Sequence, residues 1–236
     1  MPTPLILTIQ HAEAEAMGLL EPLCRELGVA WHLCHPYAGE FIPPATHPYQ
    51  GIILLGGPMH VEEVEAYPFL DAEVQLVQQA LRRQVPMLGI CLGAQLLAKA
   101  AGSRVVRGPA PEIGWFPIRL TAEGQQDPLF AGVPAEFMTF HWHGDTYELP
   151  AKAVHLAVSD QYPQQAFRLG PQAYAVQFHG EITPAMAQRW VRESSSVDPA
   201  PILEGITQHG TSAAAVGRTV LTRFLQMVVA WRTGEV

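Results

Sequence analysis

Short apolar runs alternate with stretches of helical periodicity along the first half of the chain. A short apolar run bounded by turn residues is typical of a buried strand, whereas apolar residues three and four positions apart are typical of a helix that packs on a sheet. The pattern predicts strands over residues 5–9, 29–34, 51–55 and 85–90, and helices over residues 12–27, 69–83 and 92–101. Pro22 is expected to kink or divide the first helix. This alternation favours parallel strands joined by right-handed crossovers.

Shorter apolar segments follow in the second half. The pattern predicts β segments over residues 103–107, 114–120, 137–140, 154–158, 166–169 and 174–178, helices over 184–193 and 211–231, and a flexible connector over 194–201. Several connections are too short for a helix, so antiparallel pairing is expected there. We therefore predict an α/β three-layer sandwich, with a flavodoxin-like, mostly parallel central sheet, helices on both faces and a small antiparallel addition. Residues 1–236 are expected to form a single domain, with 194–236 as a C-terminal helical extension of unknown role.

Composition and charge narrow the classes of function. The formal net charge is −8 and no basic run is present, which argues against a nucleic-acid-binding surface and against binding to an anionic membrane. The N-terminus has neither a basic start nor a cleavage site, and the longest apolar stretch, residues 212–231, is interrupted by Arg218 and Arg223. The three scattered cysteines fit a reducing compartment. We therefore expect a cytoplasmic protein, with no membrane span, that binds a small polar molecule.

The most informative stretch is residues 85–101, where Cys91 joins a predicted strand to a predicted helix. A strand-to-helix turn holds its central residue in a tight conformation, and the small neighbours Gly89 and Gly93 would let the backbone bend and leave the thiol exposed. Because Leu92 begins the helix, unpaired N–H groups and the positive end of the helix dipole lie beside the sulfur and favour the thiolate. The pattern predicts a nucleophile elbow with sulfur in place of oxygen, and the alternative is an inert buried cysteine.

A histidine and a glutamate follow the last predicted strand. Residues two apart in an extended segment point to the same side, so Glu181 can reach the imidazole of His179 while the other ring nitrogen faces a nucleophile. This spacing predicts a base and the group that orients it. Gly56 and Gly57, which follow another strand, allow the backbone to direct an N–H group into a cleft, although two glycines before Pro58 are also an ordinary turn.

Other polar residues leave their roles open. The segment 141–145, His-Trp-His-Gly-Asp, is predicted to be a loop at a strand end, where its side chains either contact a ligand or form structural hydrogen bonds. Glu112 lies beside a turn, where it is either a charged residue at the rim of the cleft or, as is usual for such a glutamate, solvated surface, and we assign it no role. Strand alternation places His32 and Cys34 on one face and His35 on the other, and no further ligand cluster follows. Strand packing is therefore expected there rather than a zinc site.

Three motifs occur together in one order: Gly56-Gly57-Pro58, then Gly89-Ile90-Cys91-Leu92-Gly93-Ala94-Gln95, then Gln177-Phe178-His179-Gly180-Glu181. Together they resemble the class I glutamine amidotransferases. Within that family the likeness is to the amidotransferase domain of GMP synthase and to free-standing relatives, which include γ-glutamyl peptide hydrolases. The motifs run from the strand at 51 to Glu181, over more than half of the chain, and they argue against the inert-cysteine interpretation.

The resemblance implies a role for each matching residue. Cys91 would attack the γ-carbonyl carbon of glutamine, His179 would act as base and then as acid, and Glu181 would orient His179. The backbone N–H groups of Gly57 and Leu92 would bind the tetrahedral oxyanion.

The resemblance also implies how the amino-acid part of the substrate is held. Gln95 would contact it, and the loop carrying Trp142, Gly144 and Asp145 would close over its backbone groups. Neither a metal nor a cofactor is implied. The ligand would be glutamine or a γ-glutamyl small molecule.

The sequence departs from the family at two points. The family most often has proline between its histidine and its glutamate, whereas Gly180 stands here and leaves that backbone less rigid. No synthetase domain follows within the 236 residues, so the acceptor stays open between water, an amine and a separate ammonia-accepting synthetase subunit. A homo-oligomer is also left open.

Three hypotheses follow. The first is an enzyme that hydrolyses the γ-amide of glutamine through a γ-glutamyl thioester. The second is a γ-glutamyl peptidase that acts on a larger conjugate with the same catalytic residues. The third is a non-catalytic regulatory or binding subunit of the same fold, against which the intact Cys91, His179 and Glu181 argue. An esterase that uses cysteine is disfavoured, because that class places its acid before its histidine.

Overall fold

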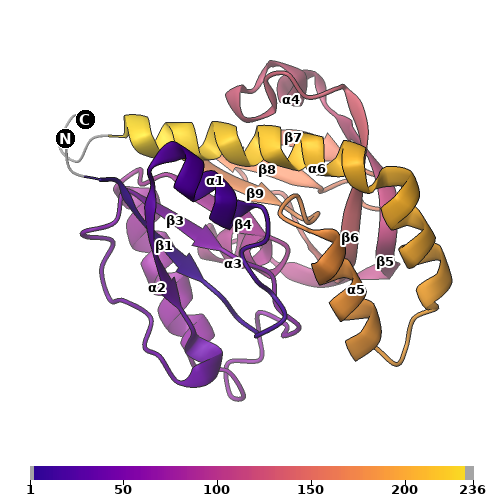
Figure 1. Ribbon diagram of the computed structural model, residues 1–236. Helices are drawn as coiled ribbons and strands as arrows, with labels where there is room; N and C mark the ends of the chain where they lie inside the picture. The colour runs from indigo at the N-terminus through magenta and orange to yellow at the C-terminus, as the bar shows by residue number, and fades with distance from the viewer. Residues whose placement is uncertain (1–2, 232–236) are drawn as a thin grey trace.

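The computed structural model describes residues 3–231 and contains one mixed sheet between two layers of helices (Figure 1). Its nine strands run in the order β2-β1-β3-β4-β9-β8-β7-β5-β6. The first five strands in this order pair in parallel, and the remaining neighbours pair antiparallel. The strands are β1 (Leu5–Ile9), β2 (Ala30–Cys34), β3 (Gly51–Leu54), β4 (Met87–Ile90), β5 (Val105–Leu120), β6 (Glu136–Tyr147), β7 (Val154–Val158), β8 (Ala166–Leu169) and β9 (Ala173–Val176). The predicted α/β class is confirmed, with a larger antiparallel part than expected.

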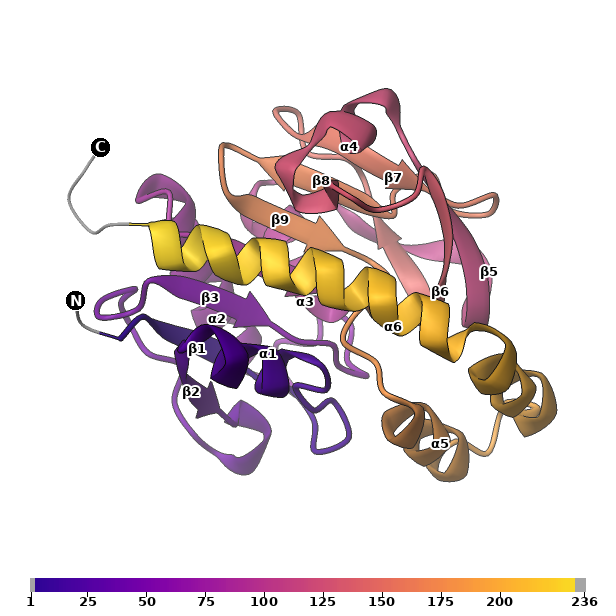
Figure 2. The same ribbon diagram turned by 45° about the horizontal axis from the view of Figure 1, so that its top comes forward.

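Two helices cover each face of the parallel part of the sheet. α1 and α6 pack on one face, and α2 and α3 pack on the other (Figure 1, Figure 2). The inner parallel strands are buried on both sides, because neighbouring residues such as Ile52 and Ile53 point to opposite faces and both are fully buried, whereas the edge strand β2 is partly exposed. The helices are α1 (Leu20–Leu27), α2 (Phe69–Arg82), α3 (Leu92–Ala100), α4 (Ala122–Gln126), α5 (Pro184–Glu193) and α6 (Pro199–Ala230), with short 3-10 turns η1 (Pro36–Ala38) and η2 (Pro128–Phe130).

The first helix is shorter than the pattern predicted. α1 begins at Leu20, and residues 10–19 form an irregular segment in place of the first helical turns. Gly18 in this segment has a φ of 52°, and the Leu19 N–H donates to the carbonyl of Glu181 at 2.9 Å. This long-range contact overrides the local helical pattern. The expected kink at Pro22 is wrong, because Pro22 falls in the first turn of α1, where the missing N–H has no helical partner.

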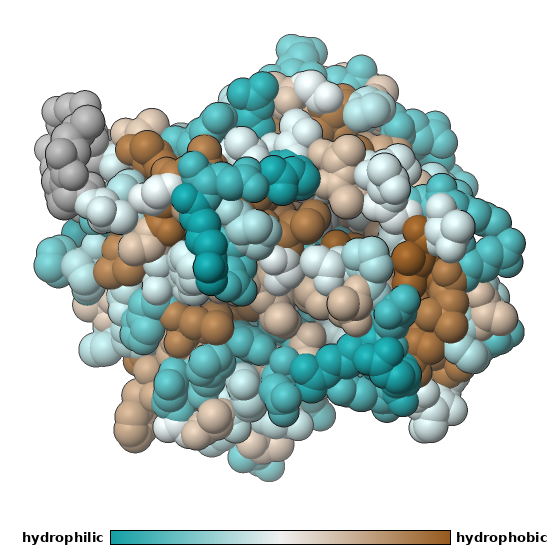
Figure 3. All heavy atoms as spheres, in the orientation of Figure 1, coloured by the Kyte–Doolittle hydropathy of each residue, from teal (hydrophilic) through white to brown (hydrophobic). Residues whose placement is uncertain are grey.

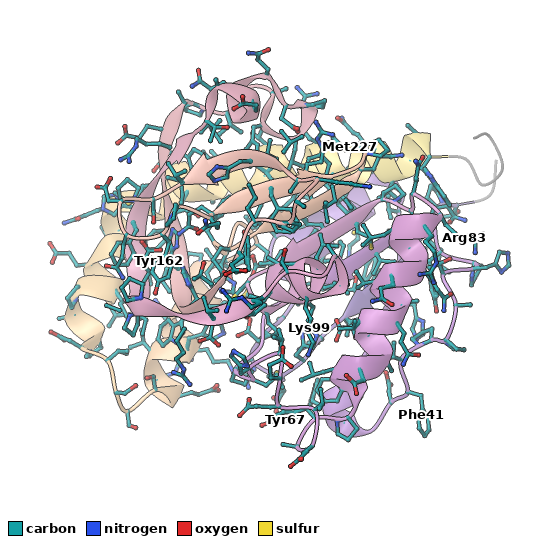
Figure 4. All side chains as sticks on the ribbon, turned by 180° about the vertical axis from the view of Figure 1, so that it is seen from behind. Phe41, Tyr67, Arg83, Lys99, Tyr162 and Met227 are labelled. Atoms are coloured by element: carbon teal, nitrogen blue, oxygen red, sulfur yellow. The ribbon has the colours of Figure 1, made fainter. Side chains whose placement is uncertain are left out.

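The predicted break between the β segments 103–107 and 114–120 and the predicted loop at 141–145 are both wrong, because two long strands replace them. β5 and β6 pair with each other antiparallel, and a register shift between Arg107 and Glu112 absorbs the prolines as a bulge. The hydroxyl of Tyr162 donates to the carbonyl of Ala110 inside this bulge, and Tyr162 is labelled in Figure 4. Local sequence does not reveal these two strands, since each is stabilised by hydrogen bonds to the other, which lies elsewhere in the chain.

The C-terminal helix begins earlier than predicted. α6 starts at Pro199 rather than at residue 211, because the carboxylate of Asp198 accepts the Ala200 N–H at 3.0 Å and caps the helix. The predicted connector 194–201 is therefore shorter. Gly205 does not break the helix, since a Cβ atom there would lie 2.1 Å from Trp115 and the helix packs directly on that indole.

By length and composition α6 could cross a membrane, and it is the one such helix in the part of the chain that the structure describes. It packs on the sheet instead. One stripe of the helix is buried in the core, where its members are at most 2% exposed: Val220, Leu221, Phe224, Leu225 and Val228. An apolar surface patch covers the N-terminal part of α6 in Figure 3, where Leu203 is exposed.

α6 also crosses directly over the segment that follows β9. A Cβ atom at Gly217 would lie 2.0 Å from the carbonyl oxygen of Gly180, so helix and segment are in backbone contact. Gly180 itself has room, since a Cβ atom there would meet its nearest neighbours at 3.8 Å. The contact with α6 therefore fixes the position of the backbone between His179 and Glu181.

This contact predicts opposite effects for two glycine-to-alanine substitutions in α6. Gly217→Ala should lower the free energy of unfolding by about 1–3 kcal/mol, because the added methyl group collides with backbone. Gly210→Ala should raise it by up to about 1 kcal/mol, because alanine favours a helix and the nearest atom to its Cβ is 3.8 Å away. Urea denaturation of both variants measures the difference. Equal stabilisation by the two substitutions would contradict the backbone contact.

Candidate active site

Cys91 occupies the turn between β4 and α3. Its backbone has φ 53° and ψ −107°, a conformation that a residue with a side chain rarely adopts. Such a conformation costs about 1–3 kcal/mol and persists only where the surrounding structure enforces it. The Cys91 N–H donates to the carbonyl of Val176 in β9 at 2.9 Å, which ties the turn to the sheet. The structure therefore has the elbow that the sequence predicted.

Two glycines make this turn possible through close packing. A Cβ atom at Gly89 would lie 2.4 Å from the carbonyl oxygen of Gly93, and a Cβ atom at Gly93 would lie 2.1 Å from the carbonyl oxygen of Leu54. α3 therefore rests on the ends of β3 and β4, closer than any side chain would allow. Glycine is needed here for the approach of the helix to the strands, and not only for the bend.

His179 and Glu181 lie beside Cys91, just after β9. Nδ1 of His179 is 2.7 Å from Oε1 of Glu181, and both side chains are buried. The His179 N–H donates to the carbonyl of Phe140 at 2.8 Å, which attaches this segment to β6. Because Nδ1 faces Glu181, Nε2 is the nitrogen left for Cys91, whose sulfur is close enough to raise the pKa of His179. The structure thus brings Cys91, His179 and Glu181 together in the order that the sequence predicted.

The surroundings of His179 favour its protonated form. Burial lowers the pKa of the imidazole, but the Glu181 carboxylate and the Cys91 sulfur raise it by more, so the pKa lies well above its ordinary value. A protonated histidine beside a nucleophile can give its proton to a departing amine.

A cavity of about 930 Å³ opens over Cys91. Gly57 and Cys91 line it, and a Cβ atom at Gly57 would lie 2.6 Å from the Leu92 side chain, so Gly57 and Leu92 are in contact. Within residues 3–231, the N–H groups of Gly57 and Leu92 donate to no other backbone carbonyl. Two neighbouring N–H groups are thus available beside the sulfur.

The chain that follows Gly57 is anchored to α3. The Lys99 ammonium donates to the carbonyl of Val61 at 2.8 Å and pairs with Glu62 at 2.9 Å. Lys99 projects from α3, where Figure 4 labels it. This anchor holds the far end of the glycine turn against the same helix that carries Cys91.

The residues expected in a closing loop lie on β6 instead. Trp142, Gly144 and Asp145 belong to the paired strand, so they form a fixed wall of the cavity. The carbonyl of Asp145 accepts from Nε2 of Gln95 at 3.4 Å, and the carbonyl of Trp142 is 3.9 Å from the Cys91 sulfur. The structure thus places Gln95 against this wall through a backbone atom.

Glu112 is a polar residue to which the sequence assigned no role and which the structure buries. Its carboxylate accepts from Ser159 and Gln165, each at 2.7 Å, and lies 3.1 Å from Nε2 of His143. Burial raises the pKa of Glu112, but its hydrogen bonds and the neighbouring histidines lower it to well below its ordinary value. Nδ1 of His143 contacts the carbonyl of Asp145 at 3.0 Å. Glu112 therefore supports the cavity wall from behind.

Glu15 is a second residue that sequence reasoning missed. It lines the cavity from the irregular segment 10–19, within 4.8 Å of His179 and Glu181 as measured between side-chain N and O atoms. Oε2 of Glu15 is buried and has no hydrogen-bond partner within the described residues. Burial, with the negative charge of Glu181, raises the pKa of Glu15 to about 7. No motif signals this carboxyl, because its neighbours come from another part of the chain.

Among residues 3–231, two groups of histidine and glutamate could hold a cation by geometry alone: Glu112 with His141 and His143, and Glu15 with His179 and Glu181. In the first group, protein donors already occupy both oxygens of Glu112. In the second, His179 and Glu181 bond to each other. We therefore assign a metal to neither. His32 in β2, a candidate zinc ligand in the sequence, contacts the hydroxyl of Tyr49 at 2.6 Å.

A comparison with protein families identifies this arrangement. The family model "Glutamine amidotransferase class-I" matches residues 24–194, a range that holds all three motifs. The chain belongs to the class I glutamine amidotransferases. The amidotransferase is similar to the glutamine amidotransferase-like protein YfeJ of Salmonella typhimurium, with 32% identity over 189 residues and 79% of each chain covered.

Two further relatives place the family match in context. The amidotransferase is 34% identical over 151 residues to a glutamine-hydrolysing GMP synthase of Porphyromonas gingivalis, of which the match covers 28%, against 63% of this chain. The solved structure of a glutamine amidotransferase of Thermotoga maritima superimposes with a TM-score of 0.86 at 32% identity, covering 97% of this chain and 99% of that one. The fold is therefore shared over nearly its whole length.

The raised pKa of Glu15 predicts a pH-dependent change in stability. A carboxyl whose folded pKa lies above its unfolded value binds more protons in the folded state, so stability falls as pH rises from about 4.5 to about 7. Glu15→Gln removes this loss and should stabilise the protein by up to about 3 kcal/mol at pH 8 and by little at pH 4. Chemical denaturation across this pH range measures it. Glu13→Gln, which removes an exposed carboxylate, is the control, and a gain from Glu15→Gln that did not vary with pH would refute the assignment.

Proposed function

We propose that this amidotransferase hydrolyses the γ-amide of glutamine, or of a γ-glutamyl compound, through a γ-glutamyl thioester on Cys91. The observation that carries the proposal is the strained Cys91 in contact with the buried His179–Glu181 pair beside the cavity. A core cysteine has no need of an unfavourable backbone conformation or of a paired histidine, so the arrangement favours a nucleophile.

In the proposed reaction the Cys91 sulfur attacks the γ-carbonyl carbon, and the carbonyl oxygen becomes an oxyanion that the N–H groups of Gly57 and Leu92 stabilise. Nε2 of His179 protonates the departing nitrogen, which leaves as ammonia or as a larger amine. A water molecule, deprotonated by His179, then attacks the thioester carbon and releases glutamate. Glu181 holds Nδ1–H of His179 throughout and offsets the positive charge of the imidazolium.

The amino-acid part of the substrate is proposed to lie between Gln95 and the β6 wall. The Gln95 amide and the backbone near Gly144 and Asp145 supply polar groups at the edge of the cavity where the γ-glutamyl α-carbon would sit. Trp142 lies on the same wall. The β6 wall pairs with β5 on both sides of Gly144, which lies opposite the bulge, so these contacts are pre-formed.

The size of the cavity favours γ-glutamyl conjugates as a second candidate substrate class. A volume of about 930 Å³ is near the upper end of the range that holds drug-sized ligands and exceeds what glutamine needs. The additional space lies toward α5, where Trp190 stacks edge-on against the His179 ring at 4.8 Å between centroids. That is the side on which the leaving amine departs.

We further propose that the amidotransferase is cytoplasmic and that its nitrogen acceptor is either water or a separate synthetase subunit. The printed name of the GMP synthase relative describes a glutamine-hydrolysing enzyme whose remaining length this chain does not match, which supports the synthetase alternative. The wide cavity supports water as the acceptor, because it has room for a γ-glutamyl peptide, and hydrolysis of such a peptide needs no synthetase partner. A role as a non-catalytic subunit is disfavoured by the complete Cys91, His179 and Glu181.

A substrate panel decides between these activities. Purified protein is incubated with glutamine and with γ-glutamyl dipeptides, and glutamate, ammonia and the released amine are each measured. Cys91→Ala and His179→Ala should abolish turnover, while Glu181→Gln should reduce it by about ten- to ten-thousand-fold because it keeps the hydrogen bond but removes the charge. Brisk release of dipeptide amines with slow release of ammonia would assign the peptidase. Turnover that survives in Cys91→Ala would end the thioester proposal.

Selective labelling of one thiol is a second expected outcome. Burial, aided by nearby glutamates, raises the pKa of Cys24 and of Cys34 to about 11, so both remain neutral thiols at pH 7.5. A glutamine-shaped electrophile should therefore modify Cys91 and spare the other two. Peptide mapping by mass spectrometry identifies the labelled residue, and the same reagent on His179→Ala is the control. Labelling of all three cysteines at equal rates would show that no thiol is activated.

A further inference from the structure

A second buried histidine–glutamate pair lies under the glycine turn of the site. His11 follows β1 and Glu73 lies in α2, and both side chains are fully buried. Nε2 of His11 is 3.0 and 2.9 Å from the two Glu73 oxygens, and Nδ1 is 3.0 Å from the carbonyl oxygen of Gly56. Beside an ionised Glu73 both partners are acceptors only, so both ring nitrogens donate and His11 carries a positive charge. Burial lowers the pKa of His11, but the Glu73 carboxylate and the Gly56 carbonyl raise it by more, which favours this charged form.

This charge is poorly explained by stability. The other buried residues of α2 are apolar: Leu70, Leu76, Val77 and Ala80. Taking a carboxylate and an imidazolium out of water is costly, and buried ion pairs can often be replaced by packed apolar side chains without loss of stability. The pair therefore requires another explanation, and within residues 3–231 its one side-chain hydrogen bond outside the pair joins His11 to the Gly56 carbonyl.

The Gly56 carbonyl and the Gly57 N–H belong to the same peptide group. In a trans peptide these two groups point in opposite directions, so a carbonyl held by His11 on one side directs the N–H to the other. Gly57 lines the cavity with Cys91, whereas His11 does not. The hydrogen bond from His11 thus aims the Gly57 N–H at the place where the proposed oxyanion forms.

A peptide between two glycines needs such a hold. Neither residue has a Cβ atom to restrict rotation, so the peptide can turn over at low cost. Side chains are excluded at both positions, because a Cβ atom at Gly56 would lie 2.5 Å from Oε2 of Glu15 and one at Gly57 would lie 2.8 Å from Cβ of His11. Because the close packing admits only glycine at both positions, no Cβ atom fixes the orientation of the peptide. The hydrogen bond from His11 fixes it instead.

We propose that His11, held and charged by Glu73, is a positioning residue that keeps the Gly56–Gly57 peptide in the orientation needed for the oxyanion hole. The inference rests on the proposed function for the use of that N–H, and on geometry alone for the orientation of the peptide. Glu73 on α2 and Glu15 of segment 10–19 are the charged groups that act on His11.

The test removes the pair without leaving a buried charge. His11→Leu/Glu73→Leu should fold, and its crystal structure should show the Gly56–Gly57 peptide rotated or in two orientations. On the substrate that wild type turns over, kcat should fall by about 10²–10³-fold with a much smaller change in KM, as on loss of one oxyanion donor. Alkylation of Cys91 by iodoacetamide should proceed at a rate similar to wild type, because displacement at a saturated carbon forms no oxyanion.

A conservative variant separates orientation from charge. In Glu73→Gln the amide can donate to Nε2 of a neutral His11, so Nδ1–H still holds Gly56 and kcat should fall by no more than about tenfold. If the double-leucine variant does not fold, the double-methionine version fills the same space with flexible side chains. A folded double variant with wild-type kcat, or with the Gly57 N–H in its original direction, overturns the proposal.

The crystal structure keeps this test separate from that of the proposed function. If wild type shows no turnover on any γ-glutamyl substrate, the proposed activity fails, and a rotated peptide in the double variant still supports the hold by His11. If wild type is active and the peptide does not rotate, the positioning role fails while the activity stands.

Discussion

The close packing of α3 on the ends of β3 and β4 is the contact on which the geometry of the site depends. Because Gly89 and Gly93 admit no Cβ atom, the helix begins directly beyond the strand, and Cys91 must take a left-handed conformation to connect them. The Gly93 N–H bonds to the carbonyl of Leu55 at 3.2 Å and thereby holds the helix start beside β3. A larger separation would let Cys91 relax and carry its sulfur away from His179.

Within residues 3–231, three buried pairs of histidine and glutamate are hydrogen-bonded: His11–Glu73, His143–Glu112 and His179–Glu181. His141 also lies 3.4 Å from Glu112 but makes no hydrogen bond. In each pair the second ring nitrogen of the histidine faces a group of the site: the Gly56 carbonyl, the Asp145 carbonyl or Cys91. Buried charge is costly to desolvate, and the three pairs concentrate it beyond the carboxyl ends of the parallel strands, where α/β sheets bind ligands. Orientation of the site, rather than stability, accounts for their common pattern.

The parts of the site whose residues lie within a few positions of one another in the chain were predictable from sequence. Gly89, Cys91 and Gly93 share one turn, and His179 and Glu181 are two residues apart, so local geometry places them. Glu15 and Glu112 were not predictable, because their partners come from segments far away in the sequence.

The fold shows the same division. The buried stripe of α6 follows from helical spacing, whereas the early turns of that helix pack on Trp115, which belongs to β5, around Gly205. The continuous β6 likewise depends on pairing with β5. The length of β5 was not predictable, because the prolines of its bulge are typical of a turn. Residues 10–19 have helical spacing, yet their contacts with the segment after β9 stabilise an irregular conformation in place of the helical turns.

The two sides of the cavity differ in how they are built. On the side of Gln95 the wall is paired backbone of β6, which the sheet holds rigidly. On the opposite side the wall consists of α5 and segment 10–19, which bind each other outside the sheet: the Trp190 indole donates to the carbonyl of Ala14 at 2.9 Å, and Arg189 pairs with Glu13. These outer elements still touch the His179–Glu181 pair, because Trp190 packs edge-on against the His179 ring and the Leu19 N–H donates to the carbonyl of Glu181. In the proposed reaction the rigid wall holds the γ-glutamyl part, and the outer elements set which amine departs.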